Sequence, residues 1–152
     1  MASTVTPATL TVTLTEAITL NGAAANTSNV LSIASVGQIT RKILKIGSTA
    51  YDPLLTFGAR ATGSAYVRAS TKYIRITNLD NANAVAIRVK NTAGSAKYGA
   101  IRLAAGQSFI LGPDYQLSTD SGTTMSGFDT ISDIEAIAVS ADVDIELYVA
   151  GA

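Results

Sequence analysis

The sequence predicts an all-β protein, an antiparallel β-sandwich that is jelly-roll-like and has about nine or ten strands. Apolar and polar residues alternate with a period of two along much of the chain. Such segments recur at spacings of about 8 to 15 residues, and no segment has the period of an amphipathic helix. An immunoglobulin-like sandwich is the alternative, although the Cys and Trp residues that usually mark it are absent.

The first predicted strand covers residues 9–20, TLTVTLTEAITL. Glu16 falls on its apolar face, which indicates a bulge or the exit of the strand from the core. Asn21-Gly22 predicts a turn, and the small polar residues 23–29 predict a loop. The uncharged residues 1–15 fit either the first strand of the same domain or an extended N-terminal arm that pairs with a neighbour's sheet edge. The apolar face of the predicted strand consists of Leu10, Val12, Leu14, Ile18 and Leu20.

Strands in the middle of the chain are predicted at 30–36 and 38–46, with a short one at 54–57. Residues 58–72 are rich in Gly, Ala and Ser and predict a long loop. Residues 73–79 and 84–90 both alternate clearly, and the intervening DNAN segment predicts that they form a hairpin.

The last third of the chain predicts four more strands and one long loop. The strands cover 98–103, 107–111, 133–139 and 143–149, and the loop covers 114–130. In the last strand, the alternation places Val143, Ile145, Leu147 and Val149 toward the core. With no internal repeat and no linker, residues 1–152 are expected to form one domain.

The composition excludes several classes of function. The 152 residues include no Cys, His or Trp. Serine–histidine catalysis, cysteine nucleophiles, His or Cys metal sites and disulfides are therefore excluded, and no cofactor is expected. No Lys or Arg precedes Arg41 and no long uncharged apolar run occurs, so neither a signal peptide nor a membrane span is predicted. The absence of Cys is consistent with assembly in a cytoplasm.

The charges are balanced in number but segregated along the chain. All 11 basic residues lie between Arg41 and Arg102, and eight acidic residues with no basic one follow Leu103. Either strands of the two segments pair their charges across the sheets, or the two signs form separate surfaces that attract other copies or another protein. With no net positive charge, nucleic-acid binding is not expected. The candidate interaction surface comprises Arg41, Lys42, Lys45, Arg88, Lys90, Asp142, Asp144 and Glu146.

Other candidate sites are weaker. The three outward acids of the last strand fit a solvated face better than a glycosidase cleft. Asp114, Asp120 and Asp129 share the long loop, but their spacing matches no EF-hand. For sugar stacking on exposed aromatic rings, Tyr66 and Tyr148 are candidates together with Tyr115, although core or interface packing is the expected role of each.

Several strand segments resemble small virion proteins of tailed bacteriophages, especially marine and cyanobacterial phages. The segments are YIRITNLD (73–80), LAAGQSFIL (103–111), ISDIEAIAV (131–139) and VDIELYVA (143–150), with ITLNG (18–22) near the N-terminus. The resemblance implies a capsid decoration, or cement, protein that binds the lattice of the major capsid protein. It implies no functional residues.

From this resemblance we expect a non-enzymatic virion structural protein on the capsid surface, assembled in the host cytoplasm and forming a homo-oligomer, a dimer or a trimer. A surface rich in Thr, Ser and Ala loses little side-chain entropy when contacts bury it. A tail, neck or head-fibre component is the alternative within the structural class. A carbohydrate- or receptor-binding module is the alternative from a different class.

Overall fold

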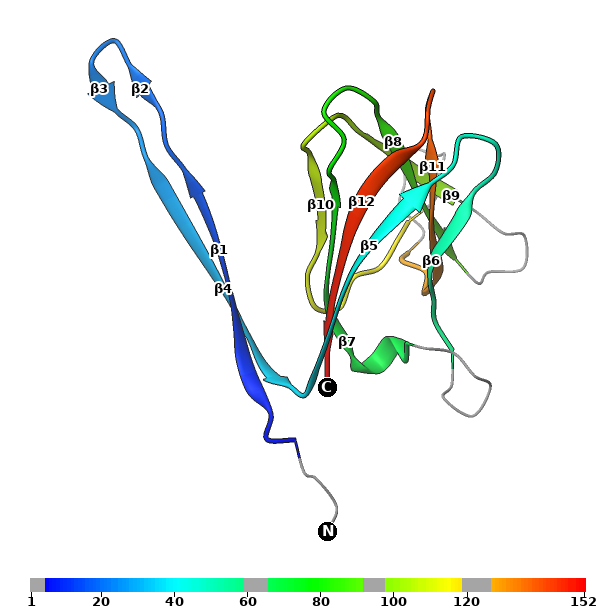
Figure 1. The fold of residues 1–152 in the computed structure, drawn as a ribbon. Helices are drawn as coiled ribbons and strands as arrows, with labels where there is room; N and C mark the ends of the chain where they lie inside the picture. Colours follow the sequence, from blue (N-terminus) through cyan, green and yellow to red (C-terminus); the bar gives the residue numbers. More distant parts are fainter. Residues whose placement is uncertain (1–4, 59–65, 92–97, 119–126) are drawn as a thin grey trace.

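Two four-stranded sheets pack face to face as a β-sandwich, and a long hairpin projects from it (Figure 1). The structure, a computed structural model, describes residues 5–58, 66–91, 98–118 and 127–152. The strands are β1 (Ala8–Glu16), β2 (Thr19–Leu20), β3 (Ala23–Ala24), β4 (Thr27–Val36), β5 (Gln38–Ile46), β6 (Asp52–Thr56), β7 (Thr71–Asn78), β8 (Val85–Asn91), β9 (Tyr98–Leu103), β10 (Ser108–Leu111), β11 (Ile131–Ala138) and β12 (Val143–Gly151), and a 3-10 turn, η2, covers Arg68–Ser70.

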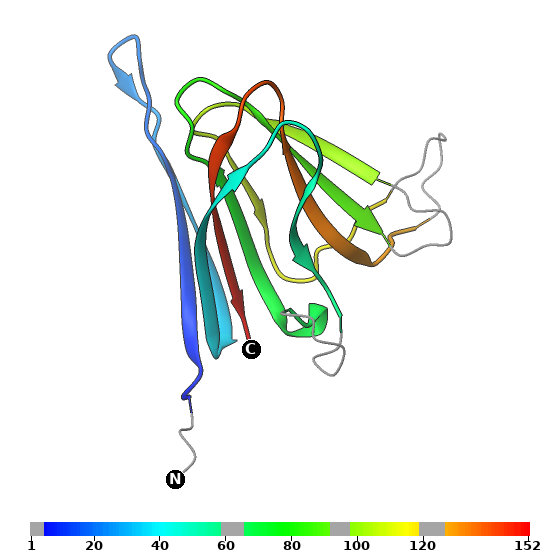
Figure 2. The same cartoon turned by 45° about the vertical axis from the view of Figure 1, so that its right-hand side comes forward.

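The sandwich strands follow a regular order in the two layers. One sheet, called here the β12 sheet, has the order β10-β7-β12-β5, and the other, the β8 sheet, has the order β6-β11-β8-β9. Every pairing between these strands is antiparallel. Figure 2 shows the two layers from a second direction. The all-β antiparallel architecture predicted from the alternation is therefore confirmed.

The core lies between the two sheets and is built from alternate residues of each strand. Ile74 and Ile76 of β7 are fully buried, as are Val85 and Ile87 of β8. The predicted inward residues of β12 are also buried, with Ile145 fully enclosed. β-branched residues suit such a pleated, packed surface. The predicted facing of these strands is therefore confirmed.

The projecting hairpin, called here the arm, consists of residues 8–36. In it β1 pairs with β4 and with no other described strand, with Leu10 opposite Ile33 and Val12 opposite Leu31. At the far end, Leu20 pairs with Ala23 across the predicted turn, in which Asn21 and Gly22 have φ of 51° and 82°. Two successive positive φ values are typical of the Asn-Gly type I′ turn. In both views the tip stands clear of the sandwich (Figures 1 and 2).

The second strand of the arm corrects one prediction. Residues 23–29 were expected to form a loop because they are small and polar, but they contain β3 and the start of β4. The turn geometry at Asn21-Gly22 returns the chain directly along β1, so that Thr27 pairs with Glu16. The arm therefore extends well past the expected residues 1–15 and continues through residue 36.

The predicted hairpin of residues 73–79 and 84–90 is wrong. β7 belongs to the β12 sheet and β8 to the β8 sheet, so the connection crosses between the layers. Asn78 is fully buried and its Nδ2 donates to the carbonyl oxygens of Asn83 and Ala104. Asp80 Oδ1 accepts from the amides of Ala82 and Asn83. These hydrogen bonds satisfy polar backbone groups of the connection between the two sheets. The local sequence does not distinguish such a connection from a tight turn.

The two predicted long loops are only partly described. Residues 59–65 of the first and 119–126 of the second lie outside the described residues, and so does Asp120. In the described parts, β7 begins at Thr71, and Leu117 pairs with Asp129 in an isolated bridge.

The core assignment predicts the effect of a charge in β12. Ile145→Asp places a carboxylate at a fully buried position, which should destabilise the fold by about 3–5 kcal/mol. Chemical denaturation of the purified variant measures this change. Ile39→Asp makes the same substitution at a residue that is 58% exposed and should change stability by less than about 1 kcal/mol. Equal stability of the two variants would show that the facing of β12 is incorrect.

Candidate interaction surface

The root of the arm packs on the outer face of the β12 sheet. Ile33 and Val36 of β4 are buried against Tyr73 of β7 and Ala150 of β12, and Leu10 adds to this cluster from β1. The ring of Tyr148 meets that of Tyr73 edge-on at 6.0 Å between centroids. This small second core attaches the arm to the sandwich independently of the main core.

The distal half of the arm has no such support. The apolar face that begins with Leu10 and Ile33 continues through Val12 and Leu31 to Leu14, because residues opposite each other in an antiparallel pair share a face. Leu14 is 56% exposed and Leu31 is 41% exposed. Ile18 and Leu20 near the tip, and Val30 on the opposite face, are also exposed. Of the two alternatives left open for this segment, a core-facing strand is wrong past Val12, because none of the described residues forms a second layer over it.

The arm also carries almost no charge. Glu16 is the only ionisable side chain in residues 1–40, and its Oε2 accepts a hydrogen bond of 2.8 Å from the Thr27 hydroxyl. A contact that covered the arm would therefore remove few charges from water. Desolvation of unpaired charges is the largest polar penalty on forming an interface.

The predicted interaction residues are spread over the two sheets of the sandwich. Arg41 and Lys45 lie on the outer face of β5, near Glu146 on β12, whereas Lys42 of β5 is opposite the inward residue Leu147. Arg88 and Lys90 lie on β8. Asp142 precedes β12 and forms an ion pair of 3.1 Å with Lys45. Asp144 is exposed, and its backbone carbonyl accepts from the Leu79 amide. The eight residues therefore do not form one continuous patch.

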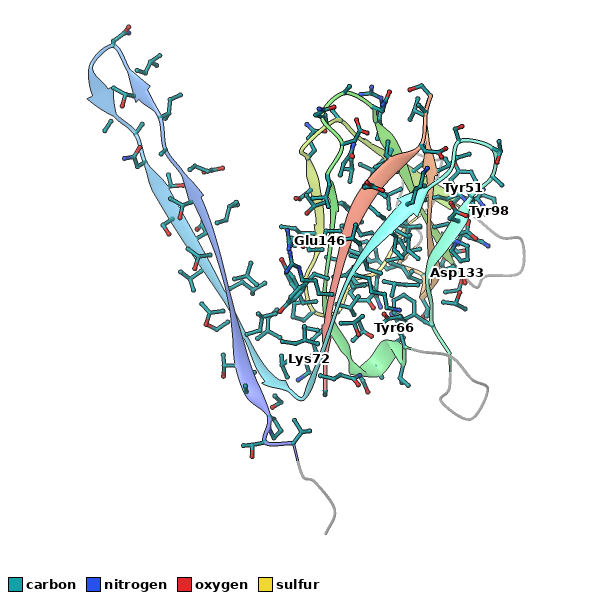
Figure 3. The ribbon with its side chains drawn as sticks, viewed as in Figure 1. Tyr51, Tyr66, Lys72, Tyr98, Asp133 and Glu146 are labelled. Atoms are coloured by element: carbon teal, nitrogen blue, oxygen red, sulfur yellow. The ribbon has the colours of Figure 1, made fainter. Side chains whose placement is uncertain are left out.

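Glu146 is the centre of the charges on the β12 sheet (Figure 3). Its side chain is only 8% exposed and contacts the guanidinium groups of Arg41 on β5 and Arg75 on β7. The hydrogen bond from Arg41 lowers the pKa of Glu146, burial opposes this shift, and the charge of Arg75 adds to it. Arg75 also lies over the ring of Tyr148, 5.8 Å from its centroid.

A similar cluster lies on the outer face of the β8 sheet. Arg88 is held between the rings of Tyr51 and Tyr98, with 3.6 Å and 4.8 Å from its guanidinium carbon to their centroids. It pairs with Glu135 of β11, which also accepts a 3.0 Å hydrogen bond from Lys90 Nζ. Burial raises the pKa of Glu135, but the hydrogen bonds from Arg88 and Lys90 outweigh it, and the net shift is downward.

These contacts show how the segregated charges of the sequence are used. Basic residues of β5, β7 and β8 meet acids of β11, β12 and the turn between them on adjacent strands. The alternative in which the two segments pair across the sheets is therefore observed for these pairs. The charges of these paired residues are mostly neutralised within the chain. The uncharged arm is therefore the more distinctive surface.

The three tyrosines considered for sugar stacking do not form a platform. Tyr66 and Tyr115 are buried, in agreement with the packing role expected for them, and Tyr148 is half-buried. Tyr98 is the exposed tyrosine, and one face of its ring already stacks on Arg88.

Within the described residues, no group of three or more acidic side chains is placed to hold a metal ion. Of the aspartates in the long loop, Asp129 accepts a hydrogen bond from Asn91, and Asp114 lies near the root of the arm. None of the described helical segments has the length and apolar character needed to cross a membrane.

No family model, curated protein or solved structure matches the chain. Sequence reasoning offered an arm only as one alternative for residues 1–15 and missed the return strand that makes it a hairpin. The signal for it was the Thr/Leu alternation without charge on either side of an Asn-Gly turn.

The paired charges predict a pH-dependent contribution to stability. Glu146→Gln should lower the free energy of unfolding by about 1–3 kcal/mol at pH 7, because it removes charge-assisted hydrogen bonds. The pKa of Glu146 is lower in the folded chain than the ordinary value of 4.5. The stabilisation by the Glu146 carboxylate is therefore complete above pH 4.5, and it disappears as the pH falls through the lower pKa of the folded state.

Denaturant unfolding at pH 7 and at low pH measures this contribution. Asp144→Asn on the same strand is the control, because Asp144 makes no ion pair within the described part of the chain. A Glu146→Gln effect that persisted undiminished at low pH would exclude the carboxylate as its source.

Proposed function

We propose that this chain is a virion structural protein, most specifically a capsid decoration protein that binds the major capsid protein lattice and stabilises the head. The resemblance of its strand segments to small phage virion proteins supports this assignment. The observation that carries it is the arm, a neutral hairpin with an exposed apolar half, attached to a stiff sandwich. Such a hairpin is suited to binding a neighbouring subunit rather than to catalysis on a small molecule.

The arm needs a partner for energetic reasons. A two-stranded hairpin without a further layer is marginally stable in water. Leu14 and Leu20 of the arm are 56% and 64% exposed, and burial of such apolar surface in a contact is favourable. Docking on a capsid subunit would cover the distal leucines and provide a further layer.

The strand order supports the jelly-roll form of the sandwich. If the eight strands from β5 to β12 are numbered one to eight, the sheets have the orders 1-8-3-6 and 2-7-4-5. We infer from this that the sandwich is a jelly roll built from two Greek keys. Viral capsid and lectin domains often use this architecture, so it is compatible with a virion role without establishing one.

Self-association is the second part of the proposal. Ile39 and Ile43 are 58% and 64% exposed on β5, which is an edge strand of the β12 sheet. Exposed apolar residues on a long edge strand favour contact with another chain. We therefore expect a dimer or trimer formed through β5, which leaves the arms free to reach the capsid.

The decisive experiment mixes the purified protein with undecorated phage heads and images them. Ordered binding at local symmetry axes supports a decoration protein, and binding at a single vertex supports a neck or tail component. Absence of binding contradicts both. Binding to glycans instead would favour the receptor-binding alternative, which the packing of Tyr98 against Arg88 does not support.

Shortening the arm tests its role directly. Replacing residues 14–29 by Asn-Gly joins Thr13 to Val30, which are opposite each other, and retains the root cluster. We expect head binding to weaken by at least about 100-fold, because a large apolar contact is lost, while thermal unfolding of the sandwich is nearly unchanged. Co-sedimentation with heads measures the binding.

Two full-length variants provide a matched comparison. Leu14→Ser changes the exposed apolar face of the arm, and Thr13→Ser changes the opposite face. The first should reduce head binding and the second should not. Undiminished binding by the shortened protein would assign the contact to another surface.

A further inference from the structure

The turn at the end of the arm contains a reactive pair of residues. Asn21 and Gly22 join β2 to β3 at the far end of the hairpin (Figure 1), and both are exposed. They form the only Asn-Gly pair in the 152 residues. The side-chain carbon Cγ of an asparagine can form a five-membered ring with the backbone nitrogen of the next residue. Gly22 is the residue type that hinders this ring least, because it has no Cβ beside the nitrogen.

The surroundings of Gly22 leave its backbone nitrogen accessible. Its amide donates to no acceptor within the described residues. A Cβ built on Gly22 would have no atom within 4 Å, so the space beside the turn is open. No packing or hydrogen bond therefore has to be broken at the nitrogen before it reacts.

The tip can also open at low cost. Ring closure requires Asn21 to leave its turn conformation, in which its φ is 51°. Above the turn, β2 and β3 contribute only two residue pairs, and all four residues are exposed. A short exposed ladder of this kind opens locally without unfolding the rest of the chain. The hydrogen bond of 2.8 Å from the Ala25 amide to the Ile18 carbonyl lies below these pairs, so the opening can be confined to residues 19–24.

We propose that Asn21 is a self-modification site that is converted to aspartate and isoaspartate by cyclisation with Gly22. The Gly22 nitrogen bonds to Asn21 Cγ, the bond from Cγ to Nδ2 breaks, and Nδ2 leaves as ammonia with the proton of the Gly22 amide. Water then opens the cyclic imide. Attack of water at Cγ gives aspartate in a normal backbone, and attack at the Asn21 carbonyl carbon gives isoaspartate. Water is the only co-reactant, and no oxidation or reduction occurs.

The reaction changes the property that distinguishes the arm. Either product places a carboxylate at the tip, which is ionised at neutral pH, whereas Glu16 is the only ionisable side chain in residues 1–40 of the parent. Isoaspartate also adds a methylene group to the backbone of the turn, so the type I′ geometry is lost. A charged tip is costly to bury in a partner. If the arm binds a capsid subunit, which rests on the proposed function, modification at Asn21 weakens that contact.

Incubation of the isotope-labelled, full-length protein in mildly alkaline buffer tests the reaction by NMR and mass spectrometry. We expect the signals of the Asn21 side-chain amide and the Gly22 backbone amide to disappear, with the mass gain of replacing NH2 by OH. Asn29 is the internal control. It is exposed on the same arm, but it lies within β4 and precedes Val30, whose branched side chain crowds the nitrogen.

The two asparagines give a direct comparison of rates. The Asn21 signals should be lost at least about 10-fold faster than those of Asn29, which corresponds to about 1.4 kcal/mol in activation free energy. Equal rates would overturn the proposal. Asn21→Gly removes the reactive amide and retains a Gly-Gly pair that also forms type I′ turns. This variant should show no comparable mass gain, and a mass gain equal to that of the parent would place the reaction elsewhere.

Head binding separates this inference from the proposed function. After the same incubation, the parent should bind undecorated heads less tightly than Asn21→Gly. Equal binding by the modified parent and this variant would exclude the tip from the head contact. Absence of head binding by both freshly purified proteins would contradict the proposed function alone, because the NMR and mass measurements use no heads.

Discussion

Packing between the inner faces of the two sheets is the interaction on which the rest of the structure depends. Ile74, Ile145, Ile87 and Ile134 are completely buried there, each from a different strand. Because successive side chains point to opposite faces of a strand, this burial also fixes the residues that face outward. The charge clusters around Glu146 and Glu135 follow from that constraint.

The arm depends on the same alternation in a second way. Tyr73 and Ala150 belong to strands whose alternate residues fill the main core, yet they are buried on the outer face. They form the surface on which Ile33 and Val36 pack. One sheet therefore supports two separate apolar layers at one end and a charged, solvated face at the other. The limited length of the second layer explains why the arm is attached at its root and exposed at its tip.

Features that depend on contacts between residues near in sequence could be predicted, and features that depend on distant residues could not. The facing of β8 and β12 was predictable, because alternation is a local pattern that the core obeys. The crossover from β7 to β8 was not, since it depends on Asn78 reaching carbonyls beyond the next strand. The sequence left residues 1–15 open between a core strand and an arm and did not decide between them. Leu14 has the same local pattern as a core residue, and only the absence of a covering layer distinguishes it.

The direction of the arm is set by a few residues at its root rather than by its long strands. The bulge at Ser35 disrupts the ladder between β1 and β4, and the Ala34 carbonyl there accepts its hydrogen bond from Lys72 of β7. A bulge bends and twists a strand pair, so the bond from Lys72 connects the bend to the sandwich. The arm itself can remain neutral and apolar because its orientation does not require charges along its length. The exposed apolar surface of the arm is thus held by contacts at its root, the apolar cluster and the Lys72 hydrogen bond, which lie outside that surface.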